Sequence, residues 1–535
     1  MAAGSILVDN FAPPDVSVEQ VHRANRVVET KWLISAALAL VAFAVCCRLY
    51  HLDTKLFWCD EEITSMLCSS KTSAQFKDYS GKPMIAASWR QLEQVSSSAP
   101  TVEVLNNLIR RDHQDQAPIY YLFARAWMQS FGHSSGTLRL LSILFSLLAF
   151  PLVFVLARQL FDTDAAWLSV ALIACSPFHL LYAQEARPYS MWLCAALVSW
   201  IAFVRAHQSG KREHWCASGL VNAIASLTHY SSFIAVAAMA ASTFLTRRRP
   251  LVLGGALSIV FTGLFISPWI VWGGPGCLNS GHHFWLDSPI DPRCYAFACI
   301  EHAAKLFLDV NCQPSVFLKA TDSLLFLSAA TCSVVGYRQT TEQGRLVMQA
   351  AVLYAIAIAL FDLVCGGRRL TVMRYMTPVL PLVQICVAAC VVAVLRQRPR
   401  LGLLVSALLI ASGVASCLVI ASASTWWSKG AEWPLRVARL LNDNERSMWI
   451  GYADVETLEM SRLVHDSVLL ERVTPERFSL PPPSIDTVFV FDRKGFVAPR
   501  LSAQGWLYNR IDGIDDILKL RRNAGLQPAA SARRL

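Results

Sequence analysis

The stretch "LFWCDEEITSM", residues 56–66, places Asp60, Glu61 and Glu62 about ten residues beyond an apolar run long enough to cross a membrane. The surrounding chain of 535 residues is 54% hydrophobic and only 16% charged, and its mean hydropathy is +0.40. This composition is too apolar for a soluble protein of this length and indicates a multispanning helical membrane protein. The three acids must therefore be explained at the surface of a bilayer.

Eleven apolar segments are candidate membrane helices, because each approaches the roughly 20 residues that a span requires. The first follows a polar tail and has no small-residue cleavage site behind it, so we interpret it as an uncleaved anchor. The segments are residues 32–50, 138–158, 165–183, 190–206, 215–229, 231–246, 250–272, 321–337, 346–365, 376–395 and 401–421.

Basic residues predict the orientation of these spans. Eleven spans place all the basic clusters on one side, which the positive-inside rule assigns to the cytoplasm. The net charge of +10 then reflects topology, and nucleic-acid binding is disfavoured because no single surface gathers the charge. The clusters are Arg23, Arg26 and Lys31, then Arg158, Lys211, Arg212, Arg247 to Arg249, Arg338, Arg345, Arg396, Arg398 and Arg400.

Residues 215–246 decide whether this topology holds. Both flanks are basic, which favours a tight hairpin turning at "LTHYSS" with His229 and Tyr230 at an exported tip. A single tilted span would reverse everything downstream. The span at 321–337 is also short.

The topology divides the chain into three parts. Residues 1–31 form a cytoplasmic tail, and residues 32–421 form a membrane module with exported loops at 51–137 and 273–320. In residues 422–535, helix-like stretches alternate with strand-like ones such as "DTVFVFD", and "LPPPS" separates units. We expect a small exported α/β domain there.

Cysteine usage leaves two alternatives open in the exported loops. An even number of cysteines permits disulfides in an oxidising compartment. His282 and His283 share the second loop with four of them, but the spacing matches no standard zinc pattern, so disulfides or free thiols are favoured over a metal. The cysteines are Cys59, Cys68, Cys277, Cys294, Cys299 and Cys312.

The acids at 60–62 have a structural and a chemical interpretation. Acids stabilise the start of a helix, which would require no further role. Alternatively, a carboxylate at a membrane face can act as a general base towards an attacking hydroxyl.

Arginines gather on the predicted exported side, against the positive-inside trend. Arg187 lies in "SPFHLLYAQEARPYS" (176–190), and Arg368, Arg369 and Arg374 lie in "CGGRRLTVMRYMTP" (365–378). They could extend towards lipid headgroups, or they could bind phosphate, whose oxygens match the guanidinium fork. A base and a phosphate site on one membrane face would suit transfer of a sugar from a lipid phosphate to a hydroxyl.

The chain resembles a known family at these motifs. "FWCDEEIT" resembles the aspartate–glutamate motif of GT-C glycosyltransferases, the polytopic enzymes related to protein O-mannosyltransferases and the bacterial lipid A aminoarabinose transferase. "APIYYLFARAWMQSFG", "YAQEARPYS", "THY" and "RYMTPVLP" resemble further stretches of the bacterial glycosyltransferase 39-like branch, in the same order. The resemblance spans roughly residues 30–420.

The resemblance implies an activity and a place. The donor would be a sugar on polyprenyl phosphate, transferred with inversion to a hydroxyl acceptor (a glycan, lipid or protein of the cell envelope) on the exported face of a bacterial inner membrane. Short helices near 84–95, 101–111 and 117–131 would lie along that face. One departure is Gln116-Ala117-Pro118, where the family often has a basic residue before two prolines; Lys82, His113 or another arginine could substitute.

The resemblance also assigns residues. Asp60 matches the catalytic aspartate and Glu61 its acidic neighbour, whereas Glu62 receives no role. The donor phosphate and lipid would be bound by Arg187, Arg368, Arg369, Arg374 and Tyr375. The pocket would be shaped by Glu185, Tyr189, His229, Tyr230 and Tyr120. No cofactor is expected, no metal ligand is assigned, and divalent-metal dependence stays open.

Three other functions fit parts of the pattern. A lipid-linked sugar transporter would share the arginines, but transporters typically show inverted repeats and the sequence has none. An oligosaccharide ligase or polymerase is chemically close to the favoured enzyme. A membrane scaffold would bind through its exported tail and would not need Asp60.

Overall fold

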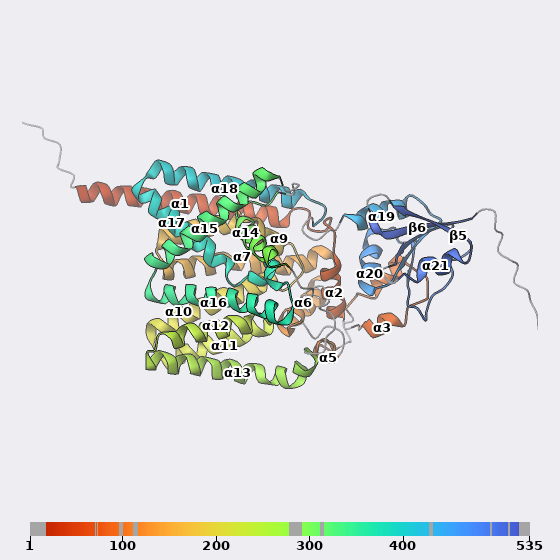
Figure 1. Cartoon of the computed structure of the whole chain (residues 1–535), viewed down its shortest axis with the longest axis horizontal. Coiled ribbons are helices and arrows are strands. Elements are labelled where there is room, and N and C mark those ends of the chain that lie inside the picture. Colours follow the sequence, from red (N-terminus) through yellow and green to blue (C-terminus); the bar gives the residue numbers. More distant parts are fainter. Residues whose placement is uncertain are drawn as a thin grey trace, which may run out of the picture.

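The structure is a computed structural model that describes residues 18–69, 71, 73–95, 100–110, 116–277, 291–310, 315–426, 432–492, 495–511 and 514–523. A bundle of long helices forms one end and a small sheet domain forms the other. A layer of short helices lies between them (Figure 1).

Each of the eleven expected apolar segments is helical. Eight helices of the described chain are long and apolar enough to cross a membrane, and the bent pair α8–α9 would make a ninth. The two remaining helices, α11 and α12, have 17 and 14 residues and are shorter. The bounds are α1 (Val18–Leu49), α7 (Ser135–Leu160), α8 (Thr163–Ala174), α9 (Pro177–Ala183), α10 (Tyr189–Ser209), α11 (Arg212–Thr228), α12 (Ser232–Leu245), α13 (Arg249–Cys277), α15 (Val316–Gln339), α16 (Glu342–Cys365), α17 (Leu380–Gln397) and α18 (Pro399–Ser422).

The expected helix at 165–183 is bent. α8 ends at Ala174, and α9 starts at Pro177 with its axis turned by 59°. Proline has no N–H for the helical ladder and disfavours helical geometry in the residue before it, so Pro177 explains the break.

Residues 215–246 form two helices joined by a tight turn at His229–Ser231, as the hairpin interpretation predicts. α11 packs against α10 and α13. The turn reaches the layer of short helices, because the Tyr230 hydroxyl donates to the Gln116 carbonyl at 3.2 Å. A single helix through this segment is excluded.

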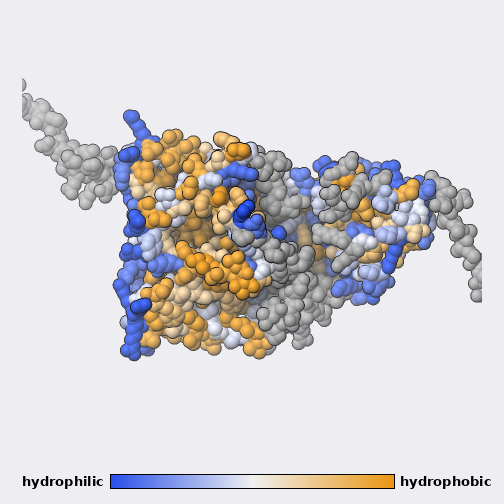
Figure 2. Space-filling view, viewed as in Figure 1, coloured by the Kyte–Doolittle hydropathy of each residue, from blue (hydrophilic) through white to orange (hydrophobic). Residues whose placement is uncertain are grey.

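The short basic turns lie together at the end of the bundle far from the sheet (Figure 1). Arg396 at the end of α17 pairs with Asp162 and Asp164 at the α7–α8 turn, at 2.7 and 2.6 Å. Arg248 pairs with Glu342 at 2.8 Å, which links the α12–α13 and α15–α16 turns. Figure 2 shows this end as a hydrophilic rim on an otherwise largely hydrophobic bundle.

Short helices cover the opposite end of the bundle. The three surface helices expected from the sequence correspond to α4, α5 and α6, while α2, α3, α14 and two 3-10 turns were not separately predicted. The bounds are α2 (Cys59–Ser69), α3 (Ser73–Lys77), α4 (Ala86–Gln91), α5 (Val102–Arg110), α6 (Pro118–Phe131), α14 (Pro292–Ala304), η2 (Arg369–Thr371) and η3 (Met373–Met376).

The C-terminal region contains the expected small α/β domain, built on a mixed sheet of order β1-β3-β2-β4-β6-β5. The central strands β3, β2 and β4 are parallel, and the outer pairings are antiparallel. Every residue of β2 and β4 is buried, as in strands covered on both faces. The bounds are β2 (Ser447–Gly451), β3 (Leu469–Arg472), β4 (Thr487–Phe491), β5 (Trp506–Ile511) and β6 (Ile514–Arg522), with α19 (Trp433–Asn442), α20 (Asp454–Leu463) and α21 (Val497–Ser502).

The segment expected to be the first exported loop contributes to this domain. β1 (Met84–Ile85) pairs with β3 from within residues 51–137. Trp89 is fully buried in the core of the domain and donates its indole N–H to the Leu470 carbonyl at 3.1 Å. The sheet domain is therefore not confined to residues 422–535.

The described cysteines of the segments expected to be exported are free thiols: Cys59, Cys68, Cys294 and Cys299. The Cys277 side chain, Cys312, His282 and His283 lie outside the described part of the chain. Within that part, no three His, Cys, Asp or Glu side chains are grouped to hold a metal ion.

Candidate active site

The acids of "CDEE" occupy the first turn of α2, where carboxylates favour the positive end of the helix dipole. Consecutive helical residues point about 100° apart, so the three side chains diverge. Each one meets a different arginine: Asp60 meets Arg374, Glu61 meets Arg139 and Glu62 meets Arg462. The motif thus joins three separate parts of the chain at one helix end.

Asp60 faces the arginines predicted to bind an anion. One oxygen of its carboxylate lies 3.5 Å from an Arg374 nitrogen, and its side chain keeps 19% exposure. Arg187 donates to the Asp60 carbonyl at 3.1 Å. Both arginines are buried, although each is charged. A partly exposed carboxylate therefore lies beside two enclosed guanidinium groups.

Arg187 is held by polar partners from residues 51–137. It donates to the Tyr121 hydroxyl and to the Gln116 side-chain oxygen, each at 3.2 Å. Tyr121 also donates to that Gln116 oxygen at 2.6 Å. Gln116 stands where the resemblance predicts a basic residue, and here it orients an arginine instead.

Aromatic rings surround Arg374. Its guanidinium lies 5.6 Å from the Tyr189 ring centre and 5.8 Å from that of Tyr375. Tyr182 meets Tyr189 edge-on at 5.1 Å. Such rings attract a cation electrostatically and limit its rotation. They fix the arginine in front of Asp60.

Glu61 lies in a closed ion pair. Both its side chain and that of Arg139 are wholly inaccessible, and the guanidinium donates to the two carboxylate oxygens at 2.9 and 2.7 Å. The backbone N–H groups of Ala186 and Trp58 donate to the same carboxylate at 2.8 and 3.3 Å. This geometry anchors α2 and the Arg187 loop to α7, and leaves Glu61 no open face for a substrate.

Glu62 connects α2 to the sheet domain. Its carboxylate accepts from Arg462 of α20 at 2.8 Å, and the same guanidinium donates to Glu93 at 2.7 Å. Arg462 also lies over the Phe57 ring, 4.4 Å from its centre. The acid without a role in the family resemblance is thus part of a domain contact.

The remaining predicted phosphate ligands lie one turn away. Arg369 pairs with Asp362 of α16 at 3.3 Å, and Arg368 precedes η2. Tyr375 accepts a hydrogen bond from Tyr354 through its backbone carbonyl. The structure therefore brings Arg187, Arg374 and Tyr375 together at Asp60, whereas Arg369 is engaged by another carboxylate.

The residues predicted to shape the pocket divide into two groups. His229 stacks flat on Trp192 at 3.8 Å and lies 5.9 Å from the Tyr375 ring. Burial, with Arg187 and Arg374 adding to it, lowers the pKa of His229 to about 3, so the imidazole is neutral. Tyr230 accepts a hydrogen bond from Trp269 at 2.8 Å.

The other two residues predicted to shape the pocket, Glu185 and Tyr120, are enclosed by the protein. Glu185 is fully buried in the α9–α10 turn, where it adds negative charge beside Arg187. Tyr120 is fully buried in the apolar cluster that holds α6 against α7. Tyr120 therefore supports the site indirectly, by holding α6 against α7.

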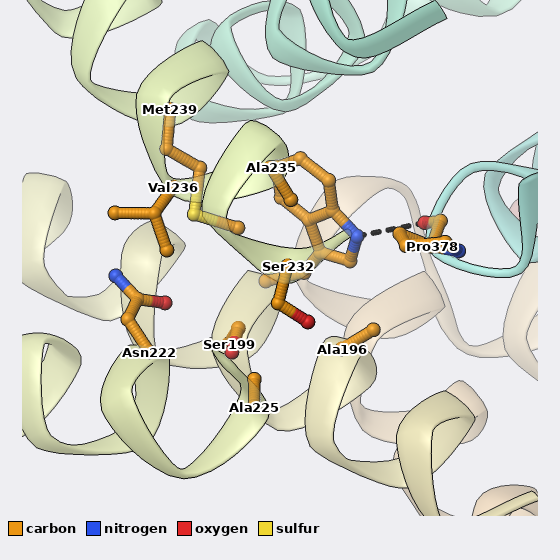
Figure 3. Close-up of a pocket in the computed structure, with 10 residues that line it drawn as sticks. Ala196, Ser199, Asn222, Ala225, Ser232, Ala235, Val236, Met239 and Pro378 are labelled. Atoms are coloured by element: carbon orange, nitrogen blue, oxygen red, sulfur yellow. Dashed lines mark hydrogen bonds between the residues drawn. The ribbon is translucent and has the colours of Figure 1, made fainter. Parts of the chain in front are cut away.

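A small pocket lies deeper in the bundle, between α10, α11 and α12 (Figure 3). Trp200 donates to the carbonyl of Pro378, four residues beyond Arg374, at 2.9 Å. Ser199 and Asn222 enter this pocket with oxygen atoms that have no hydrogen-bond partner among the described residues. Its lining contains no predicted catalytic residue.

Sequence reasoning missed three residues that organise the site: Arg139, Gln116 and Arg462. Arg139 is a single arginine inside the apolar "TLRLLSILF", which is a detectable signal because a charge in such a helix needs a partner. Arg462 has no comparable signal, since it lies in an ordinary amphipathic helix.

Comparisons with known proteins agree with this architecture. Residues 115–272 match the family model described as dolichyl-phosphate-mannose-protein mannosyltransferase. The fold is similar to that of ArnT from Cupriavidus metallidurans, solved in the apo state and bound to undecaprenyl phosphate. Both comparisons give a TM-score of 0.51 and 13% identity over 92% of this chain and 99% of that one.

A second similar structure is the archaeal oligosaccharyltransferase AglB from Archaeoglobus fulgidus, in complex with an inhibitory peptide and a dolichol-phosphate. The TM-score is 0.51 with 10% identity, over 92% of this chain and 75% of that one. No curated protein sequence matches the chain. The fold is therefore similar to those of two polytopic membrane enzymes, and residues 115–272 are similar to the protein mannosyltransferases.

Proposed function

We propose that the chain transfers a sugar from a polyprenyl-phosphate donor to a hydroxyl acceptor of the cell envelope, with inversion, on the exported face of a bacterial inner membrane. Asp60 is the general base. The observation that carries this proposal is the position of the Asp60 carboxylate, which lies 3.5 Å from a guanidinium nitrogen of Arg374. Arg187 donates to the backbone carbonyl of the same residue. A proton acceptor therefore lies beside two guanidinium groups that can bind an anion.

The reaction proceeds by a single displacement. The acceptor oxygen attacks the anomeric carbon, its proton passes to the Asp60 carboxylate, and the bond from that carbon to the phosphate oxygen breaks. The electron pair leaves with polyprenyl phosphate, whose negative charge is stabilised by Arg374 and Arg187. Attack opposite the leaving group inverts the anomeric centre.

The 3.5 Å contact between Asp60 and Arg374 suits this exchange. It is longer than a tight charge-assisted hydrogen bond, and a phosphate that enters beside Asp60 would bring its oxygens to the same guanidinium. A monophosphate carries less charge than a diphosphate, and two arginines can balance it without a metal ion. Glu61 acts by positioning, because its ion pair with Arg139 fixes the turn that carries Asp60.

The other proposed residues act around this centre. Tyr189 and Tyr375 hold Arg374, while His229 and Tyr230 line the same end of the bundle. Arg368 and Arg369 lie where a lipid headgroup would enter from η2.

The test is sugar transfer in liposomes. Wild type, Asp60→Asn and the exposed control Asp443→Asn would receive a panel of polyprenyl-phosphate sugars, with membrane extract as the acceptor. Released polyprenyl phosphate is counted. We expect wild type and the control to consume one donor class, and Asp60→Asn to fall by about a hundredfold or more, since general-base loss typically costs 10²–10⁴-fold.

Two results would contradict the proposal. A folded Asp60→Asn variant with wild-type turnover would remove Asp60 from the chemistry. Absence of lipid phosphate release from every donor by wild type would favour a transporter, for which flipping of the same lipids is the next assay. Release from diphosphate-linked oligosaccharides only would favour a ligase.

A further inference from the structure

The sheet domain forms one wall of the catalytic site through α20. This helix packs against α2 and α4 on the side of the domain nearest the membrane bundle (Figure 1). Arg462 fastens it there, because its guanidinium binds Glu62 at 2.8 Å and Glu93 at 2.7 Å. The face of α20 that carries Arg462 is therefore turned towards the first turn of α2.

Glu459 lies on that same face, three residues before Arg462. Its side chain is buried, and no described residue donates a hydrogen bond to it or forms an ion pair with it. Burial, reinforced by Glu456 and Glu61, raises the pKa of Glu459 well above its usual range. The charges that act on it belong to α20 and to the catalytic motif.

Cys59 reports the same convergence from α2. Burial raises the pKa of its thiol, and Asp60, Glu456 and Glu459 act in the same direction, whereas Arg187 opposes them. Cys59 begins α2 directly before Asp60. Because α20 packs against α2, its carboxyl groups lie close enough to the helix turn that carries Asp60 to act on it electrostatically.

A buried carboxyl group without a partner is expensive and needs a reason. Transfer of a polar group from water is unfavourable unless a hydrogen bond compensates it. Three other buried acids of this region have arginine partners, namely Glu61, Glu62 and Glu93. Glu459 has no such partner among the described residues.

We propose that α20 forms the acceptor side of the catalytic site, and that Glu459, with Glu456 beside it, binds hydroxyl groups of a polyhydroxylated acceptor such as a sugar ring. This inference rests on the proposed function. The arginines then bind the donor phosphate on the side of η3 and the α9–α10 turn, while the acceptor is bound from the side of α20.

A neutral hydroxylated acceptor suits Glu459, because burial favours the protonated carboxyl and a protonated carboxyl can both donate and accept hydrogen bonds. Carboxyl groups three residues apart on a helix have Cβ atoms about 5–6 Å apart, so Glu456 and Glu459 can engage neighbouring hydroxyls of one ring.

The test compares transfer with hydrolysis. Glu459→Gln, Glu456→Gln and the exposed control Glu476→Gln are assayed with the donor identified for wild type. Sugar transfer is measured against increasing membrane extract, and donor hydrolysis by water is measured without extract. We expect Glu459→Gln to need about tenfold more extract for half-maximal transfer, while its donor half-saturation and hydrolysis stay at wild-type values. Asp60→Asn loses both reactions, which separates the two proposals.

The acceptor class is tested on the extract itself. Periodate cleaves vicinal diols, and acylation blocks amines; both reagents are quenched before the donor is added. We expect periodate-treated extract to lose acceptor activity and acylated extract to keep it. The opposite pattern would overturn the polyhydroxylated acceptor.

Other outcomes would also overturn the inference. Wild-type dependence on extract in both folded glutamine variants would remove α20 from acceptor binding. Parallel loss of hydrolysis and transfer in folded Glu459→Gln would place Glu459 on the donor side. Gel filtration and thermal unfolding show whether each variant folds. If Glu459→Gln does not fold, the same transfer and hydrolysis assays on Glu456→Gln test the inference. If wild type neither transfers nor hydrolyses, both proposals fall.

Discussion

Three consecutive acids at a helix start perform three different tasks because their environments differ. Asp60 keeps part of its surface open and has a loose arginine contact, which suits a group that must exchange a proton. Glu61 is closed on every side by donors. Glu62 lies against the sheet domain. Helical geometry separates them, so one short motif can carry the proposed base, its support and a domain contact.

The Glu61–Arg139 pair gives a residue-scale prediction. Arg139→Met leaves a fully buried carboxylate without its cation and should destabilise the protein by about 3–5 kcal/mol. The double variant Glu61→Gln/Arg139→Met removes that charge and should recover part of the loss. Thermal unfolding midpoints of the purified proteins measure both effects.

The matched control is Arg396→Met. Arg396 pairs with Asp162 and Asp164 while its side chain is 44% exposed, so its loss should cost at most about 1 kcal/mol. Equal midpoints for Arg139→Met and Arg396→Met would show that the buried pair does not support α2.

The sequence could assign a residue to the site only where its chemical type was unusual for its position in the predicted topology. Arginines on the exported side broke the positive-inside trend, so Arg187 and Arg374 could be predicted beside Asp60. Arg139 and Arg462 lie 78 and 400 residues from the acids they bind, and no local pattern specifies such a distant partner. Ion pairs of this kind are set by packing.

At the scale of elements, hydrophobic periodicity and segment length were sufficient to predict the long helices but not all the short elements. All eleven apolar segments are helical, because an apolar run of that length has few other solutions in a membrane. The two-residue strand β1 has no sequence signature, since its pairing with β3 is determined by the partner strand. For the same reason the contribution of residues 51–137 to the sheet domain could not be predicted.

The strand β3 gives a prediction for this domain. Glu471 on β3 is buried, and its carboxylate accepts from the backbone and hydroxyl of Ser479, both at 2.9 Å. Burial raises the pKa of Glu471 to about 7, although the Ser479 bonds oppose the shift. Between its unfolded value of 4.5 and about 7, the folded protein holds a proton that the unfolded protein has released, so stability falls as pH rises.

Glu471→Gln should remove that slope. The amide keeps an oxygen for Ser479 and never ionises, so the variant should gain stability relative to wild type on going from pH 5 to pH 8. Thermal unfolding midpoints at both pH values give the difference. A constant offset between the two proteins would mean that the buried carboxyl does not titrate in this range.

At the scale of the whole molecule, sequence predicted which loops lie on the same side of the membrane, while the side that faces the cytoplasm stays a prediction. Positive-inside counting placed every short basic loop on one face, and in the structure those turns meet at the end of the bundle far from the sheet domain (Figure 1). Hydropathy could not establish that α11 and α12 are separate helices. The evidence came from the basic residues on both sides of this segment. If both of its ends lie in the cytoplasm, the segment must cross the membrane an even number of times.

This sidedness gives the last prediction. Fusions after Gly210, at the α10–α11 turn, and after Arg248, at the α12–α13 turn, should report a cytoplasmic end, and a fusion after Asn523 should report an exported one. Two complementary reporters, one active only outside the membrane and one fluorescent only inside, measure each fusion. Because the hairpin of α11 and α12 lies between Gly210 and Arg248, a pattern with these two fusions on opposite sides would contradict the hairpin. A uniformly inverted pattern would keep the fold and place Asp60 on the cytoplasmic face, where donor lipids on that leaflet would become the substrates to test.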